Sequence, residues 1–271
     1  MKQLINSIES ITKQAGGTWG ISLDDLDKKE TWTSNEDELF YAASVIKVPI
    51  LLAAFTAFDQ RKFSLSDTVK LRKEDLVGGS GVLQHMTPGT RLTIYDLVTL
   101  MIIQSDNTAT NMVIDLVGTK KIQQTMEDLG LENSRFYNKL MVVPANLEGR
   151  NLVTAADMTS MLKQMVMGEV VSMHACEQMI DMLKKQQLQN CLPARLPEQD
   201  SEIIGTPNEW ELAHKTGSIS RVCHDIGILY VGNRTMVVSI LSKGVEDRTS
   251  PKVIADIGWE IYHYLKEDNY K

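Results

Sequence analysis

The spacing of apolar residues changes along the chain from helical to alternating, then to helical again, and finally back to alternating. A stripe of leucine and isoleucine at helical spacing predicts a helix over residues 3–15, which ends at the glycine pair that follows it. Alternating apolar and polar residues then predict two strands, over 18–24 and 30–34, with a turn between them. The chain therefore begins with one helix and the first strands of a sheet.

The middle of the chain, from residue 44 to about 190, has a mostly helical pattern. The clearest predicted helices cover residues 96–104, 108–117, 120–129 and 158–167. After a polar, proline-containing connection, alternation predicts strands over 210–214, 225–231 and 235–241, and a last helix runs from residue 250 to about 266. Strands at both ends of the chain with helices between them predict an α+β fold in which late strands complete one sheet.

We expect a single catalytic domain over residues 1–271. Its sheet lobe would consist of about 1–43 and 205–271, and a helical lobe of about 44–204 would be inserted into it. A chain of 271 residues is long enough for two such coupled lobes.

The composition is that of a soluble globular protein, with 43% hydrophobic and 23% charged residues. The net charge of −7 and a pI near 5.3 argue against a nucleic-acid partner, which needs a basic face, and against binding to anionic membranes. We expect a monomer that acts on a small molecule. The apolar N-terminal residues fit a helical stripe and not the core of a signal peptide, so we expect a cytoplasmic protein. A secreted chain whose signal had been removed would look the same.

Three cysteines, Cys176, Cys191 and Cys223, cannot all pair with one another. We expect three reduced thiols, with Cys223 buried on a strand. Because C-x-x-C and H-E-x-x-H spacings are missing from the sequence, we expect no metal site, and no other feature calls for a cofactor.

Three short motifs follow one another along the chain: Ser44-Val45-Ile46-Lys47, Ser105-Asp106-Asn107 and Lys215-Thr216-Gly217. S-x-x-K alone has little value, because it also occurs at Ser10/Lys13 and Ser160/Lys163, where a solvated helix face explains it. Only the copy at Ser44 is followed by both other motifs. The ordered set is the signature of class A β-lactamases and penicillin-binding proteins.

Ser44 and Lys47 supply a nucleophile and its base. On a helix they share one face, because residues three apart lie about 5–6 Å from each other at Cβ. Lys47 accepts the serine proton only when neutral, which requires its pKa to fall by roughly three units, and burial and a second cation are the two available causes. Its apolar neighbours favour burial, and Lys215 is the candidate cation. Pro49 requires either that the helix starts late or that it is kinked.

The other two motifs supply a proton relay and an anion site. Ser105 can pass a proton between a lysine and a leaving group, and the carboxamide of Asn107 can bind Lys47 or a substrate amide. A helix N-cap is the alternative interpretation of this triplet, and the two are compatible. Lys215 and Thr216 can bind a substrate carboxylate, and Gly217 allows close approach to the backbone.

On these motifs the chain resembles the class A β-lactamases and related penicillin-recognising serine hydrolases over nearly its whole length. Gly79–Gln84 also resembles the loop that borders the cleft in that family. The resemblance implies an antiparallel sheet flanked by the terminal helices, with an inserted all-helical lobe. It further implies acylation of Ser44 and an oxyanion hole formed by the backbone N–H groups of Ser44 and Ser218. Where relatives often place a carboxylate-binding arginine, this chain has His224.

The chain departs from the family in the loop over 135–152. Class A enzymes have an E-x-x-L-N stretch there, whose glutamate activates the deacylating water. This loop lacks the motif, and its only carboxylate is Glu148. Glu148 is therefore the candidate base for deacylation, and a solvent-facing loop carboxylate is the alternative.

Three functions follow from these motifs. The first is hydrolysis of β-lactams through an acyl-enzyme at Ser44. The second is a related esterase, D-amino-acid peptidase or amidase with little β-lactam turnover. The third is a non-catalytic sensor that β-lactams acylate and that then stalls. Rates of turnover distinguish the three.

Overall fold

The computed structural model describes residues 1–141, 149–198 and 208–267. Its centre is a five-stranded sheet with the order β2-β1-β9-β8-β7, and every pair in it is antiparallel. The strands are β1 (Thr18–Asp25), β2 (Glu30–Ser34), β7 (Trp210–Ile219), β8 (Val222–Val231) and β9 (Arg234–Lys243). Late strands therefore complete a sheet that the first two begin, as the alternation pattern predicted.

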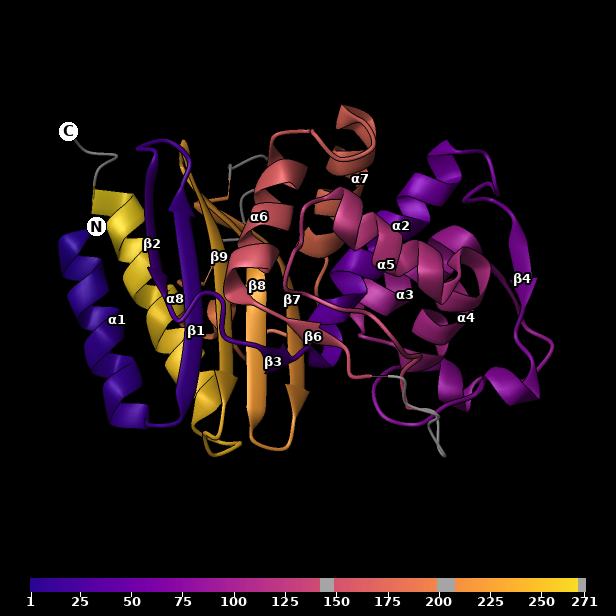
Figure 1. The fold of residues 1–271 in the computed structure, drawn as a ribbon, viewed down its shortest axis with the longest axis horizontal. Helices are drawn as coiled ribbons and strands as arrows, with labels where there is room; N and C mark the ends of the chain where they lie inside the picture. The colour runs from indigo at the N-terminus through magenta and orange to yellow at the C-terminus, as the bar shows by residue number, and fades with distance from the viewer. Residues whose placement is uncertain (142–148, 199–207, 268–271) are drawn as a thin grey trace.

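The two ends of the chain form the helices on one face of this sheet. They are α1 (Lys2–Ala15) and α8 (Ser250–Glu267), which pack side by side (Figure 1). The apolar stripe of α1 points inward and buries Leu4 and Ile8 in a core shared with α8 and the sheet. The fold is α+β, with an antiparallel sheet flanked by the terminal helices, as expected.

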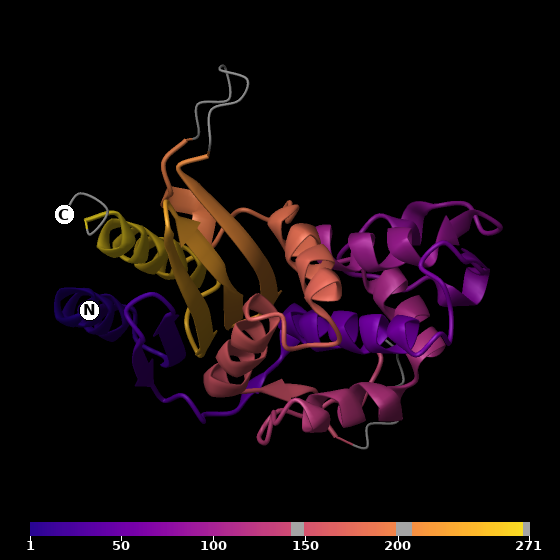
Figure 2. The same cartoon turned by 90° about the horizontal axis from the view of Figure 1, so that it is seen from above.

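The opposite face of the sheet is covered by α6 (Ala155–Val166), which packs on β1, β8 and β9 (Figure 2). Thr154 caps this helix by accepting the backbone N–H of Asp157 at 3.2 Å. The Asp157 carboxylate accepts hydrogen bonds from the backbone N–H and the hydroxyl of Ser134, whereas the backbone N–H of Thr154 donates to the Ser134 hydroxyl. The helix therefore begins at Ala155, three residues earlier than predicted.

The helical lobe lies beside the edge strand β7. Its helices are α2 (Lys47–Asp59), α3 (Ile94–Ile103), α4 (Asn107–Val117), α5 (Thr119–Asp128) and α7 (Met173–Lys184). The short elements are β3 (Phe40–Tyr41) paired with β6 (Leu152–Val153), β4 (Thr68–Lys70) paired with β5 (Arg91–Thr93), and the 3-10 turns η1 (Ala43–Ile46), η2 (Lys73–Asp75), η3 (Leu83–His85) and η4 (Leu192–Arg195). None of the described helices is long and apolar enough to cross a bilayer.

The central helix of this lobe is α2, which is buried on nearly all sides. Side chains such as Ile50, Leu51 and Leu52 are inaccessible to solvent, and each contributes about 1.5–3 kcal/mol of hydrophobic stabilisation. The α-helix begins at Lys47, after a 3-10 turn, so Pro49 lies in the first helical turn, where a missing N–H leaves no hydrogen bond unmade. The late start, and not a kink, is how the chain accommodates this proline.

Candidate active site

The three motifs, far apart in the sequence, meet where the helical lobe contacts β7. Ser44 is in η1, Lys47 begins α2, and Ser105 precedes α4. Lys215, Thr216 and Gly217 lie on β7, which packs against η1 (Figure 1). The structure thus brings the predicted nucleophile, base, relay and anion site together.

Lys47 is at the centre of this constellation and is completely buried. Its Nζ atom lies 3.1 Å from Ser44 Oγ, 2.9 Å from Ser105 Oγ, 2.6 Å from the Ser105 carbonyl oxygen and 2.8 Å from Asn107 Oδ1. Ser44 is half-buried, whereas Ser105 and Asn107 are buried. The nucleophile is therefore the most accessible of the four side chains.

The environment of Lys47 lowers its pKa well below the ordinary value of a lysine. Burial is the largest cause, and the positive charge of Lys215 adds to it, while the carboxylate of Asp106 opposes both. These are the two causes expected from the sequence. A neutral amine close to a serine hydroxyl is the arrangement that a general base requires.

Ser105 reaches Lys47 through an unusual backbone conformation. Its φ angle is +52°, in the left-handed region that non-glycine residues rarely occupy. In this conformation both the hydroxyl and the carbonyl oxygen of Ser105 contact Lys47 Nζ. Strained residues of this kind cluster at functional sites, where the surrounding structure holds them in place.

The carboxylate of Asp106 holds the strained turn at Ser105 in place. One carboxylate oxygen accepts the backbone N–H of Ala109 at 2.9 Å and so caps α4. The other accepts the backbone N–H groups of Val82 at 2.6 Å and Leu83 at 2.8 Å. The N-cap interpretation of the triplet is confirmed for Asp106, which also ties the loop at Gly79–Gln84 to the catalytic turn.

The same loop needs its glycines. Gly81 has φ +104°, and a Cβ on it would lie 2.3 Å from the Cα atom of Asp106. The backbone of Asn107 donates to the carbonyl of Ser80 at 3.0 Å, and its side chain donates to the carbonyl of Gly78 at 3.1 Å. The predicted border of the cleft is therefore in direct contact with the S-D-N motif.

Gly217 brings β7 close to the nucleophile. A Cβ at this position would lie 2.9 Å from the backbone nitrogens of both Ser44 and Val45. The N–H of Ser44 is in the first turn of η1, before the hydrogen bonds of the helix begin. Close approach here places the strand that carries Ser218 beside this N–H group, as an oxyanion hole requires.

Lys215 and Thr216 are both buried in the strand. Burial lowers the pKa of Lys215 to about 7, although the negative charge of Asp225 opposes this shift. Thr216, Gly217 and Ser218 line a cavity of about 410 Å³ at this end of the strand. Thr216, whose hydroxyl would bind a substrate carboxylate, thus borders this cavity, whereas Lys215 is completely buried and its Nζ atom donates to the Thr216 carbonyl at 2.8 Å.

Comparison with known proteins agrees with this geometry. The family model described as "Beta-lactamase enzyme family" matches residues 2–265. The chain belongs to this family. It is accordingly a serine hydrolase of β-lactamase type.

Three similar proteins illustrate the likeness. A crystal structure of a β-lactamase from Sphaerobacter thermophilus superposes with a TM-score of 0.88, at 31% identity over 98% of each chain. A variant of PBP-A, captured as an acyl-enzyme with penicillin G, has a TM-score of 0.84 at 26% identity, over 98% of this chain and 97% of that one. A β-lactamase of Rhodobacter capsulatus is 30% identical over 65% of this chain, and the match spans 60% of that protein's length.

His224 does not have the role that the family pattern implied. Its Nδ1 atom accepts the backbone N–H of Ser242 at 3.2 Å, and its Nε2 atom lies 2.9 Å from the carbonyl of Tyr41. Burial lowers its pKa to about 4, so the ring is neutral. His224 pairs with Gly217 across β7 and β8 and borders the same cavity as Thr216 and Ser218, but its two ring nitrogens are both bonded within the protein. The structure therefore does not support His224 as a carboxylate ligand.

The loop that carries the deacylating glutamate in class A enzymes is described only in part. Glu148 lies outside the described residues. The described parts, 135–141 and 149–152, contain no carboxylate. They are held by Asn151, whose Oδ1 accepts the backbone N–H groups of Tyr137 and Asn138, and by Asn111, which bonds to both backbone groups of Leu140.

Among the residues that the structure describes, no group of three or more His, Cys, Asp or Glu side chains could hold a metal ion. The three cysteines are free thiols and all are buried. The hydrogen bonds that Asp106 accepts from the Gly79–Gln84 loop were not predicted, because no local sequence pattern links residues more than twenty positions apart. The proximity of Cys191 to Cys223 was not predicted for the same reason.

Proposed function

We propose that this chain reacts with β-lactams by acyl transfer to Ser44, with neutral Lys47 as the base, and hydrolyses the resulting ester slowly. The observation that carries the proposal is the buried Lys47 amine, 3.1 Å from Ser44 Oγ, with its pKa lowered by burial and by Lys215. The likeness to a PBP-A variant captured with penicillin G supports the choice of substrate.

The hydrogen bonds around Lys47 fit a neutral amine. Two of its neighbours, the Ser105 carbonyl and Asn107 Oδ1, only accept hydrogen bonds, and a neutral amine has two N–H groups to donate to them. Its lone pair is then free to accept the proton of Ser44. The Ser44 oxygen attacks the lactam carbonyl as this proton moves to Lys47.

The next steps use the other motifs. The backbone N–H groups of Ser44 and Ser218 stabilise the negative charge that develops on the carbonyl oxygen. Lys47 then returns the proton through Ser105, whose hydroxyl lies 2.9 Å from Nζ, to the lactam nitrogen as the C–N bond breaks. Lys215 and Thr216 hold the substrate carboxylate meanwhile.

Deacylation requires a base for the attacking water. Since the 135–152 loop lacks the E-x-x-L-N stretch and Glu148 is its only carboxylate, we infer that hydrolysis of the acyl-enzyme is slower than its formation. This same observation favours the second candidate: a related esterase, D-amino-acid peptidase or amidase with little β-lactam turnover. If the acyl-enzyme were not hydrolysed at all, the chain would be a β-lactam-binding protein that is acylated and stalls.

Intact-mass spectrometry tests the proposal. The protein is mixed with penicillin G or with a p-nitrophenyl ester, and the mass is followed over time. We expect one penicillin adduct per chain that forms quickly and disappears slowly. An adduct from the ester alone would replace the proposal with the second candidate, and the absence of adduct and turnover with both would overturn serine acylation altogether.

A steady-state assay with nitrocefin separates the remaining cases. A burst of one equivalent followed by slow turnover is the proposed behaviour. A burst without turnover would identify the stalled sensor. Ser10→Ala serves as a control variant, because it removes the exposed serine of another S-x-x-K pair and should leave both assays unchanged.

A further inference from the structure

Cys191 and Cys223 lie close together although they are 32 positions apart in the chain. Their sulfur atoms are 3.7 Å apart, both residues are buried, and both are free thiols. A disulfide needs a separation of about 2.0 Å, so small rotations about the side-chain bonds would bring the sulfurs within bonding distance. Cys176, in contrast, donates its thiol to the carbonyl of Val170 and has no sulfur partner among the described residues.

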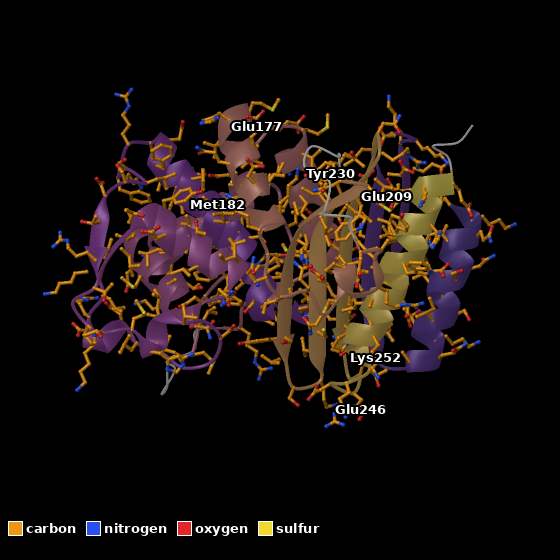
Figure 3. The ribbon with its side chains drawn as sticks, turned by 180° about the vertical axis from the view of Figure 1, so that it is seen from behind. Glu177, Met182, Glu209, Tyr230, Glu246 and Lys252 are labelled. Carbon is orange, nitrogen blue, oxygen red and sulfur yellow. The ribbon has the colours of Figure 1, made fainter. Side chains whose placement is uncertain are left out.

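The two cysteines lie beside a cavity. Both thiols line the cavity of about 410 Å³ that also borders Thr216 and Ser218. The cavity lies at the end of the sheet where α8 begins. Figure 3 shows Glu246 and Lys252 at this end, and Glu209 and Tyr230 at the opposite one. Cys223 is 4% exposed and Cys191 is 1% exposed, so Cys223 is the more accessible residue of the pair.

The two sulfurs are chemically different. Hydrogen bonds from Cys191 and from Ser250, the first residue of α8, lower the pKa of Cys223, although burial opposes this. The same bond to Cys223, together with burial, raises the pKa of Cys191. Because the thiolate is the form that reacts with oxidants, Cys223 is the better nucleophile, and Cys191 is the resolving thiol that reacts with it afterwards.

We propose that Cys191 and Cys223 form a reversible redox site, which a peroxide converts to an intramolecular disulfide. The sulfur of Cys223 attacks one oxygen of hydrogen peroxide, the O–O bond breaks, and a sulfenic acid and one water form. The sulfur of Cys191 then attacks that of Cys223, the S–O bond breaks, and a second water leaves. The two thiols are oxidised, and one peroxide is reduced to two waters.

The disulfide would connect two elements that border the substrate end of the cleft. Cys191 precedes η4, and Cys223 lies on β8 opposite Ser218 of β7. The new bond would close a loop between positions 32 apart, which constrains the unfolded chain. We expect the melting temperature of the oxidised protein to rise by roughly 5–10 °C. This site is independent of the function proposed for Ser44.

Thiol counting by mass spectrometry tests the site in the full chain. The protein is reduced, freed of reductant, treated with hydrogen peroxide and then alkylated with iodoacetamide in denaturant. The reduced protein should take up three alkyl groups, since all of its cysteines are free. The oxidised protein should take up one, at Cys176, and dithiothreitol should restore all three. Three alkyl groups after oxidation would overturn the proposal.

Variants assign the reaction to the pair. Cys176→Ala should still form the disulfide, because its thiol lies apart from the pair. Cys191→Ser should leave a sulfenic acid on Cys223 that dimedone labels, since the resolving thiol is missing. Loss of two alkylatable thiols in Cys191→Ser would instead show that Cys223 pairs elsewhere, and would contradict the proposal. The wild-type measurement needs no variant, so poor folding of either one leaves the test intact.

Discussion

The Nζ atom of Lys47 lies 3.1 Å from the Oγ atom of Ser44, in a position where the lysine has no access to solvent. The two residues are three positions apart, but they lie on either side of the junction between a 3-10 turn and an α-helix. This junction directs the serine toward the cleft and the lysine toward the interior. The sequence spacing of S-x-x-K therefore produces an accessible nucleophile beside a buried base.

Acylation by carboxylate-bearing substrates should weaken at alkaline pH. The pKa of Lys215 is about 7, so the lysine loses its positive charge as the pH rises through this value. A substrate carboxylate binds the charged form, and kcat/KM for penicillin G should fall by up to about tenfold per pH unit above it. A neutral p-nitrophenyl ester should show no such decline. An equal decline for both substrates would contradict the assignment of Lys215.

The same lysine should make stability depend on pH. Its pKa is about 7 in the folded protein and about 10.5 in the unfolded chain, so the unfolded state binds more protons between these values. The free energy of unfolding should therefore rise with pH over this window, by roughly 5 kcal/mol in total from this group. Below pH 7 the group is protonated in both states and contributes no slope.

Lys215→Met isolates this contribution. Between pH 7.5 and pH 9 the wild type should gain roughly 2 kcal/mol more than the variant, measured by urea unfolding at each pH. Lys13→Met, at an exposed position, is the control and should keep the wild-type slope. A variant with an unchanged slope would show that Lys215 is charged in the folded protein at neutral pH.

Asp106→Asn should affect both stability and catalysis. The carboxylate accepts backbone hydrogen bonds from Ala109, Val82 and Leu83, and a neutral amide would present an N–H group to some of these donors. We expect a loss of about 1–3 kcal/mol in unfolding free energy. Asp106 also raises the pKa of Lys47, so the acid limb of the acylation profile should move to lower pH in the variant. Movement to higher pH would contradict the electrostatic account.

Gly217→Ala should separate catalysis from stability. The added methyl group would lie 2.9 Å from the backbone nitrogens of Ser44 and Val45, so β7 would have to move away from the nucleophile. We expect acylation to slow by about 10²-fold, the cost of removing one oxyanion donor. Gly78→Ala is the matched control, because the nearest atom to its added methyl group lies at 4.0 Å. Equal rates for the two variants would show that close approach at Gly217 is unnecessary.

Much of the fold follows from local pattern. The strand over Glu30–Ser34 has the predicted bounds, and the first helix begins one residue earlier than predicted, because alternation and helical stripes are properties of short segments. The strands β7 and β8 are longer than predicted, since K-T-G-S-I resembles a turn in composition yet continues the ladder as far as the pair Ile219 and Val222. The pairing with β8 and not local propensity decides this segment.

The site was predictable where one element supplies the answer. Apolar neighbours predicted the burial of Lys47, and the three motifs identified the residues around it. The bonds of His224 to Tyr41 and Ser242 were not predictable, because they join segments that only the tertiary fold brings together. The bonds between Asp106 and the Gly79–Gln84 loop connect segments that only the tertiary fold brings together.

The most direct test of the account is the rate of acylation of Lys47→Ala as a function of pH, compared with wild type and with Lys13→Ala. Removal of the general base should slow acylation by penicillin G by about 10²–10⁴-fold and should eliminate the acid limb of the profile. Lys13→Ala, which alters the exposed lysine of another S-x-x-K pair, should match the wild type. A Lys47→Ala variant with the rate and the pH profile of the wild type would contradict the central claim that Lys47 activates Ser44.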